Sequence, residues 1–244
     1  MVNGDSKSLE EFWKSIGFCA AICFTGNKER KEHLLTELSR IGIRNPYIVW
    51  SFPTPYKDFI IRRIPHCKEM DEHPGYVGAT FAHYSAVKIA YELGYDKAFI
   101  CEDDCRFLTD INAIEKYLAN VPSDFDFLLL DSFGIKGFKA TENQLWNLCD
   151  RSYSTAAYIV TRTTMRVLIE LYESPVSGKY KHPLLRNSDH WANKKLLGQS
   201  ARIYYANPNI CIQCKCPGKT NTGTNYIWEQ YKNRGIDTDR YAGY

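Results

Sequence analysis

The chain is organised around AFICEDDCRF, residues 98–107, in which an apolar run ends abruptly in three consecutive carboxylates, Glu102, Asp103 and Asp104. Buried charge is costly unless it is paired or bound to a metal ion, so acids directly after a core strand indicate a site. In open α/β sheets, ligands bind outside the carboxyl ends of the strands. The three acids are expected to lie at that edge.

The three acids are the ligand type that Mg²⁺ and Mn²⁺ prefer, and a divalent cation would relieve their mutual repulsion. Such sites usually supply one or two protein carboxylates and let substrate phosphates complete the coordination. The stretch therefore indicates a metal–nucleotide site. An acidic solvated turn with Arg106 as its ion-pair partner is the alternative, and both interpretations stay open on these residues alone.

Length and composition indicate an ordinary globular chain of 244 residues, 44% hydrophobic and 24% charged. The net charge of +3 is too small to indicate a nucleic-acid partner, and none is predicted. Nine cysteines, an odd number, do not indicate a disulfide framework. Residues 1–14 have no apolar segment typical of a signal peptide, and no apolar run is long enough to span a membrane. We expect a soluble cytoplasmic protein, for which peripheral membrane contact stays open.

Hydrophobic periodicity predicts alternating helices and strands. An amphipathic helix over 8–16 precedes a strand over 18–24, a helix over 28–41 and a strand over 47–50. The last three form a β-α-β unit, which predicts a parallel sheet with a right-handed crossover. Further helices are predicted over 80–93, 111–118, 163–172 and 189–197, and further strands over 95–101, 125–130, 158–160 and 203–205. Residues 51–77, 132–150 and 174–187 are expected to be loops, and the chain from Asn207 is expected to wrap the surface.

The turn after the first strand offers a second candidate site. Thr25 and Gly26 precede a helix N-terminus, whose backbone N–H groups can hold a phosphate or nucleoside, and Arg30 follows. No G-x-G-x-x-G is present, so the dinucleotide fingerprint is absent. A solvated helix start explains the turn equally well.

The order of these motifs resembles glycosyltransferase family 25, which includes bacterial lipooligosaccharide and collagen galactosyltransferases. Residues 78–84, GATFAHY, and the strand ending in Glu102-Asp103-Asp104 are similar to the family's G-x-x-x-S-H helix and E-D-D strand. Residues 24–30, 155–160, 188–191 and 205–213 resemble further family segments in the same order. Two features depart from the pattern: Ala82 replaces the usual Ser, and the first turn lacks the usual run of arginines.

The resemblance implies an α/β fold of GT-A type: a Rossmann-like, mostly parallel central sheet flanked by helices, in a single domain over residues 18–213. Residues 1–17 would form an N-terminal amphipathic helix, and residues 214–244 a Cys/Gly-rich tail that packs on the domain or acts as a lid. It also implies an inverting transfer of galactose or a similar hexose from a UDP-linked nucleotide sugar to a glycan or glycoprotein acceptor. Mn²⁺ or Mg²⁺ would assist.

In this chemistry a metal ion stabilises the negative charge that develops on the leaving diphosphate. In D-x-D-like motifs the last acid typically reaches the metal, so Asp104 is the first candidate ligand and Asp103 the next. Glu102 is a candidate for the metal or for the ribose. His190 is a fourth candidate, because many GT-A enzymes take a ligand from a later histidine.

An inverting transfer also needs a base that deprotonates the acceptor hydroxyl. Asp189, at a predicted helix start after Ser188, is the best candidate, and a helix-capping role is its structural alternative. Asp131, at the end of another predicted strand, is the reserve, with shaping of the acceptor pocket as its other role.

The remaining candidates concern the nucleotide and the tail. His83 can fix its helix beside the nucleotide or be a structural histidine, and Lys219 can close over a diphosphate as part of a lid. A zinc site at Cys211, Cys214 and Cys216 lacks a nearby fourth ligand. Trp191, Tyr226 and Trp228 can stack on acceptor sugar or pack in the core. The nucleotide-binding set is Thr25, Gly26, Arg30, His83, Glu102, Asp103 and Lys219.

Two other functions remain as alternatives. A non-catalytic module of the same fold would bind carbohydrate or nucleotide without turnover. A metal-dependent nucleotidyltransferase would release pyrophosphate, whereas a glycosyltransferase releases a nucleoside diphosphate or monophosphate.

Overall fold

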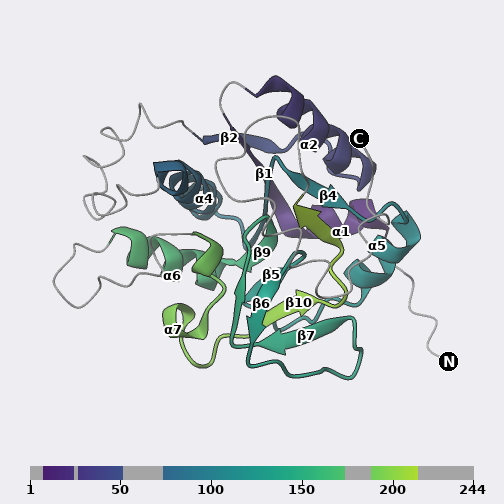
Figure 1. The fold of residues 1–244 in the computed structure, drawn as a ribbon, viewed down its shortest axis with the longest axis vertical. Helices are drawn as coiled ribbons and strands as arrows, with labels where there is room; N and C mark the ends of the chain where they lie inside the picture. The colour runs from purple at the N-terminus through teal and green to yellow at the C-terminus, as the bar shows by residue number, and fades with distance from the viewer. Residues whose placement is uncertain (1–7, 25–26, 52–73, 174–187, 214–244) are drawn as a thin grey trace.

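The computed structural model describes residues 8–24, 27–51, 74–173 and 188–213 (Figure 1). Its centre is a seven-stranded sheet in the order β2-β1-β3-β9-β5-β10-β7. The strands are β1 (Gly17–Phe24), β2 (Tyr47–Ser51), β3 (Lys97–Glu102), β5 (Phe127–Leu129), β7 (Trp146–Cys149), β9 (Ala157–Thr161) and β10 (Ile203–Ala206). Only β7 and β9 run against the other five, because β9 pairs antiparallel with β3 and β5, and β7 with β10. This confirms the predicted α/β class with a mostly parallel sheet.

Helices cover both faces of the sheet in one domain (Figure 1). One face packs against α1 (Leu9–Ile16), α2 (Lys28–Arg40) and α5 (Ile111–Ala119), and the other against α4 (Pro74–Glu92), α6 (Arg162–Glu173) and α7 (Lys194–Leu197). Neighbouring residues of β1 alternate between the two cores: Ala21 and Cys23 face the first group, Ala20 and Ile22 the second. A strand buried on both faces reads as a continuous apolar run, which is why 18–24 is recognisable in the sequence.

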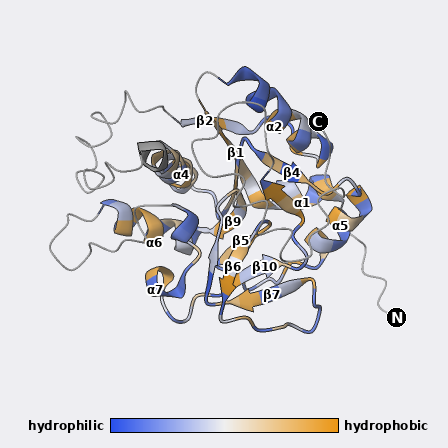
Figure 2. Cartoon of the chain, in the orientation of Figure 1, coloured by the Kyte–Doolittle hydropathy of each residue, from blue (hydrophilic) through white to orange (hydrophobic). Residues whose placement is uncertain are grey.

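Side-chain caps explain why several helices begin where the sequence predicts. Ser8 and Glu11 form a capping box at α1. Asn27 accepts a hydrogen bond from the Arg30 backbone N–H at α2, and Asp110 caps α5 in the same way. The outer surface of α2 is strongly hydrophilic, whereas the central strands are largely apolar (Figure 2). The predicted helices over 8–16, 28–41, 111–118 and 163–172 are confirmed to within about two residues.

Two predicted helices differ from the structure. α4 begins at Pro74, six residues before the predicted start, because proline is tolerated in the first turn of a helix. The predicted helix over 189–197 is wrong: Ser188–His190 form a 3-10 helix, η4, and α7 begins only at Lys194. Asn193 is extended and its side chain accepts a hydrogen bond from Lys195 N, so a new cap interrupts the helix.

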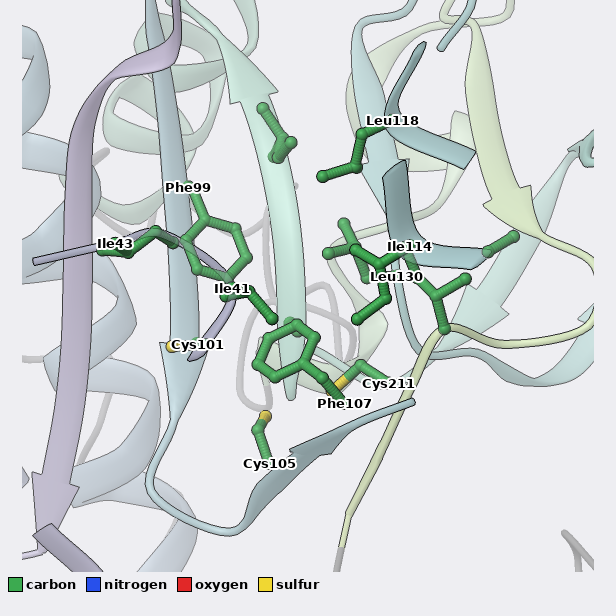
Figure 3. Packing of buried hydrophobic residues seen from close by; sticks show 14 of the residues in the cluster. Ile41, Ile43, Phe99, Cys101, Cys105, Phe107, Ile114, Leu118, Leu130 and Cys211 are labelled. Carbon is green, nitrogen blue, oxygen red and sulfur yellow. The ribbon is translucent and has the colours of Figure 1, made fainter. Parts of the chain in front are cut away.

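Short strands account for the other errors. The predicted loop over 132–150 contains β6 (Phe133–Lys136) and β7, and β6 pairs with β8 (Arg151–Tyr153). β4 (Cys105–Phe107) pairs with β11 (Cys211–Gln213), so residues 211–213 are buried and do not wrap the surface. Cys105, Phe107 and Cys211 pack there against Phe99 and Leu130 (Figure 3). Strands of three or four residues are too short for a periodic signal.

Three further predictions from the sequence concern disulfides, membrane-spanning helices, and the loops and C-terminal tail. Cys19, Cys23, Cys101, Cys105, Cys149 and Cys211 are free thiols. Within the parts of the chain that the structure describes, no helix is long and apolar enough to cross a bilayer. The predicted loops over 52–73 and 174–187 and the predicted tail over 214–244 lie outside the described residues.

Candidate functional site

The carboxyl ends of β1, β3 and β5 and the start of β9 meet at one edge of the sheet, because β9 runs in the opposite direction. Five carboxylates gather there: Glu102, Asp103, Asp104, Asp131 and Asp189. Their charges interact, since Asp131 raises the pKa of both Glu102 and Asp104, and Asp189 raises that of Glu102. The structure thus brings together the acids predicted from three separate stretches of sequence.

Arg30 binds two of these acids. Its Nη2 lies 2.5 Å from Asp103 Oδ1 and 3.1 Å from Asp104 Oδ2, and all three side chains are buried. Asp103 Oδ2 also accepts a 2.7 Å hydrogen bond from the Phe24 backbone N–H. Burial raises the pKa of Asp103, and the Arg30 charge and the Phe24 bond oppose that rise. Asp103 and Asp104 are therefore buried and paired with Arg30, which joins the acid turn to the first turn of α2.

Asp104 has an oxygen that fits a metal ligand. Its Oδ1 is buried and has no hydrogen-bond partner in the described part of the chain. Burial raises the pKa of Asp104 well above its usual value, with the charge of Glu102 as the next cause. No group of three or more His, Cys, Asp or Glu side chains is arranged to hold a metal ion in residues 8–24, 27–51, 74–173 and 188–213. A Mg²⁺ site that relies on substrate phosphates needs only one or two protein carboxylates, which Asp104 and Glu102 can supply.

Glu102 is held by a buried histidine. His83 Nε2 lies 3.0 Å from Glu102 Oε1, and His83 Nδ1 lies 3.1 Å from the Tyr158 hydroxyl. Burial lowers the pKa of His83 to about 4, against the opposing charge of Asp189. Burial, followed by the charges of Asp189 and Asp103, raises the pKa of Glu102 to about 8. A neutral His83 can donate to one neighbour and accept from the other, so it orients Glu102.

Asp131 is fully buried, and both of its oxygens are used. Oδ2 accepts from the Ser154 hydroxyl at 2.8 Å, and Oδ1 accepts from Asn209 Nδ2 at 2.6 Å. Asn209 also contacts Ser132, through that residue's hydroxyl and carbonyl oxygen. Ser154 has φ +100°, a left-handed conformation that costs free energy in a residue other than glycine. The Asp131 bond therefore holds a strained residue at the entrance to β9.

The segment after Ser154 connects the acid turn to Asp189. The Ala156 carbonyl accepts a 2.7 Å hydrogen bond from the Glu102 backbone N–H. Asp189 Oδ1 accepts from the Thr155 backbone N–H at 3.3 Å, and the Thr155 hydroxyl lies 3.3 Å from the same oxygen. η4 is in turn fixed to α4, because Ser188 N donates to Thr80 Oγ1 at 3.2 Å. Residues 154–156 thus set the spacing between Glu102 and Asp189.

His190 and Trp191 follow Asp189 in different surroundings. The His190 ring packs edge-on against Tyr153, with ring centroids 4.8 Å apart, and burial lowers its pKa. Trp191 is fully buried and packs edge-on against Tyr172 and His83, so it belongs to the core of the α4 face. Thr25, Gly26, Cys214, Cys216, Lys219, Tyr226 and Trp228 lie outside the described residues.

Sequence reasoning missed four residues of this network: Ser154, Thr155, Tyr158 and Asn209. Thr155 and Tyr158 belong to the T-A-A-Y-I-V stretch that resembles the family pattern, so a role in the site could have been suspected. Ser154 and Asn209 carry no such signal, because their importance depends on a left-handed backbone and on a contact with Asp131 across 78 positions.

No family model matches this chain, and no curated protein matches it. Among solved structures, it is similar to the crystal structure of mannose-1-phosphate geranyltransferase from Thermus thermophilus. The TM-score is 0.41 at 10% sequence identity, covering 78% of this chain and 73% of that one. A likeness of this size carries no argument about function, which therefore rests on the site itself.

Proposed function

We propose that the protein is a metal-dependent glycosyltransferase of GT-A type, related to glycosyltransferase family 25. It would transfer galactose or a similar hexose, with inversion, from a UDP-sugar to a glycan or protein acceptor. The observation that carries this proposal is the buried, unpartnered Oδ1 of Asp104 beside Glu102, at the sheet edge where α/β proteins bind ligands. A buried acceptor without a donor is rare in native proteins and fits a cation.

Each group at the edge has a role in this proposal. Asp104 and Glu102 would hold Mn²⁺ or Mg²⁺, which supplies charge stabilisation for the departing diphosphate. Asp103 fixes Arg30 and the end of β1, and His83 fixes Glu102. Arg30 brings positive charge to the edge where the phosphates would bind.

Asp189 is the proposed base. Thr155 holds one of its oxygens, which leaves the carboxylate oriented at the edge where an acceptor hydroxyl would bind. An inverting displacement requires the base on the face of the sugar opposite the leaving group, and Asp189 arrives on η4, separately from the acid turn on β3. Asp131 is fully buried and each of its oxygens already accepts a hydrogen bond, so we assign it a positioning role through Ser154.

A donor screen tests the proposal. Purified full-length protein with Mn²⁺ is given UDP-, GDP-, CMP- and dTDP-sugars, and released nucleotide is measured. We expect UDP release from one donor that needs added metal. Asp104→Asn should abolish it, because the isosteric amide replaces a charged ligand with a neutral one. Asp124→Asn, at a half-exposed carboxylate paired with Arg202, is the matched control and should retain full activity.

The other outcomes separate the alternatives. Pyrophosphate release from a nucleoside triphosphate and a sugar 1-phosphate would replace the proposal with a nucleotidyltransferase. A thermal shift with UDP-sugars, but no release in the presence of water or added sugars as acceptors, would favour a binding module. Metal-independent turnover, or full activity in the Asp104→Asn variant, would contradict the proposed role of the acid turn.

A further inference from the structure

Arg151, on β8, is a half-buried cation that pairs with no carboxylate in the described residues. Its guanidinium lies over the Tyr153 ring, with Cζ 4.8 Å from the ring centroid, and its buried Nε has no hydrogen-bond partner there. The neighbouring acid, Asp150, is already paired with Lys194 at 2.9 Å. Buried polar groups are nearly always hydrogen-bonded in native proteins, so an arginine in this state indicates a missing acceptor.

His190 also packs against Tyr153. Its ring is edge-on to Tyr153 at a centroid distance of 4.8 Å, and its buried Nδ1 also lacks a hydrogen-bond partner within the described chain. Arg151 and His190 are close enough for the arginine's charge to lower the histidine's pKa, after the larger effect of burial and against the charge of Asp189. Arg151 and His190 therefore contact the same ring, and each has a buried nitrogen without a hydrogen-bond partner in the described chain.

Packing fixes the Tyr153 ring, which both side chains contact. A Cβ atom at Gly134, which has φ +56°, would lie 2.3 Å from Tyr153 Cδ2, so the β6 backbone runs directly against the ring. The Phe133 ring stacks on Tyr153 with centroids 6.1 Å apart. The ring is thus held by the paired strands β6 and β8, and the guanidinium lies against the ring in turn.

This cluster lies beside the proposed base. Ser152 N donates to the Ala192 carbonyl at 3.0 Å, and Arg151 forms an antiparallel bridge with Asn193, so β8 runs alongside the segment that follows η4. Asp189 directly precedes His190 in that 3-10 helix. A group bound by Arg151 and His190 would therefore bring a connected hydroxyl toward Asp189.

We infer that Arg151 and His190 form an anion subsite, which binds a carboxylate or phosphate group carried by the acceptor sugar. The inference rests on the proposed function, since it names the acceptor of that same site. An anion fits Arg151 better than a metal ion does, because the guanidinium attracts an anion and repels a cation. The Asp189 charge opposes that effect at His190, so His190 contributes a hydrogen bond and not a charge. Arginine also suits this ligand chemistry, because Nε and an Nη atom together match the two oxygens of a carboxylate or phosphate.

Sugar binding to the full-length chain without donor tests the inference apart from turnover. The probes are methyl glucuronide, glucose 6-phosphate and, as the neutral match, methyl glucoside, each titrated by ligand-observed NMR. We expect the two acidic sugars to bind about tenfold more tightly than the neutral one. A tenfold change in Kd is about what one hydrogen bond to a charged group contributes. Comparing the Kd of methyl glucuronide with that of glucose 6-phosphate shows whether a carboxylate or a phosphate is preferred.

Substitutions locate the effect. Arg151→Gln should reduce acidic-sugar binding to the neutral level and leave UDP binding unchanged, and Arg151→Lys should retain part of the preference. Arg166→Gln, which removes an exposed arginine paired with Glu170 on α6, is the matched control and should change neither. Equal binding of acidic and neutral sugars, or an unchanged preference in Arg151→Gln, would overturn the inference. So would loss of Mn²⁺ binding in His190→Asn with acidic-sugar binding intact. Absence of UDP-sugar turnover would instead contradict the proposed function.

Discussion

At the scale of single residues, the site is defined by which polar atoms are satisfied and which are not. Asp103 and Asp131 use both carboxylate oxygens, whereas Asp104 leaves one buried oxygen without a partner in the described part of the chain. Adjacent acids that look equivalent in sequence therefore differ in what they can bind. The sequence predicted that the acid turn forms a site, but only the hydrogen bonds separate its structural members from its candidate ligands.

The contact between Tyr158 and His83 should contribute to stability, because both side chains are fully buried. Tyr158→Phe removes the hydroxyl and leaves His83 Nδ1 without its partner, so we expect the free energy of unfolding to fall by about 1–3 kcal/mol. Denaturant unfolding measures this. Tyr204→Phe is the matched control: the Tyr204 ring is buried, but its hydroxyl contacts the half-exposed side chains of Arg202 and Asp124, so the loss should be less than about 1 kcal/mol. An equal loss in both variants would contradict the importance of the buried contact.

Ser154 combines backbone strain with a hydrogen bond to a buried carboxylate. Ser154→Ala keeps the strain of φ +100° and removes the bond to Asp131, so we expect a loss of about 1.5–3 kcal/mol. Ser154→Gly loses the same bond but relieves the strain, and should be about 1 kcal/mol more stable than the alanine variant. Thermal unfolding of the two variants side by side checks the order. If alanine proved the more stable, the left-handed backbone at this position would carry no cost.

At the scale of elements, long amphipathic helices and doubly buried strands could be predicted, because their periodicity and caps are local properties of the sequence. The β6–β8 pair, the β4–β11 pair and the break between η4 and α7 could not. The strands β4, β6, β8 and β11 have three or four residues each, and β4 pairs with a segment more than 100 positions away. The same limit applies to the site: local reasoning found the acids on β3, and it missed Ser154 and Asn209, whose contacts are made across the fold.

An ionic contact between two helices gives a pH-dependent prediction. Glu173, at the end of α6, accepts hydrogen bonds from Lys88 and Tyr84 of α4, and the Lys88 bond is the main cause of its lowered pKa. A carboxylate whose pKa is lower in the folded state stabilises the fold above its unfolded pKa of 4.5, and this stabilisation is lost as the pH falls through the folded value. Glu173→Gln should therefore be less stable than the parent at pH 7.

The difference in stability between Glu173→Gln and the parent should narrow as the pH falls below about 4.5, because Glu173 in the parent then loses its charge as well. Melting temperatures of both proteins from pH 7 to pH 3 measure it. Glu170→Gln, an exposed acid of the same helix in a long 3.8 Å pair with Arg166, is the control and should show a smaller effect at every pH. A Glu173→Gln deficit that stayed constant down to pH 3 would contradict the ionic origin of the contact.

At the scale of the whole molecule, the fold is a single α/β domain whose candidate chemistry lies at one edge of the sheet. The class of fold was predictable, because a β-α-β start and apolar strands of this kind permit few topologies. The reversed direction of β9 was not predictable from its own residues, since the sequence T-A-A-Y-I-V fits either orientation. That reversal decides which residues lie at the site: the segment before the N-terminal end of β9 supplies Ser154 and Thr155, whereas a parallel β9 would have placed its C-terminal end there.

The position of β9 between β3 and β5 also has a consequence for the order in which the protein folds. While the chain is being made, residues 98–107 emerge well before residues 154–161 and 188–213, which later surround them. Until those segments dock, β3 lacks one of its two neighbours, and a run of apolar side chains next to three acids faces water. The first half of the chain is thus an incomplete sheet with an exposed edge, a form prone to association with other chains. We therefore expect docking of β9 both to complete the candidate site and to cover the exposed edge of β3.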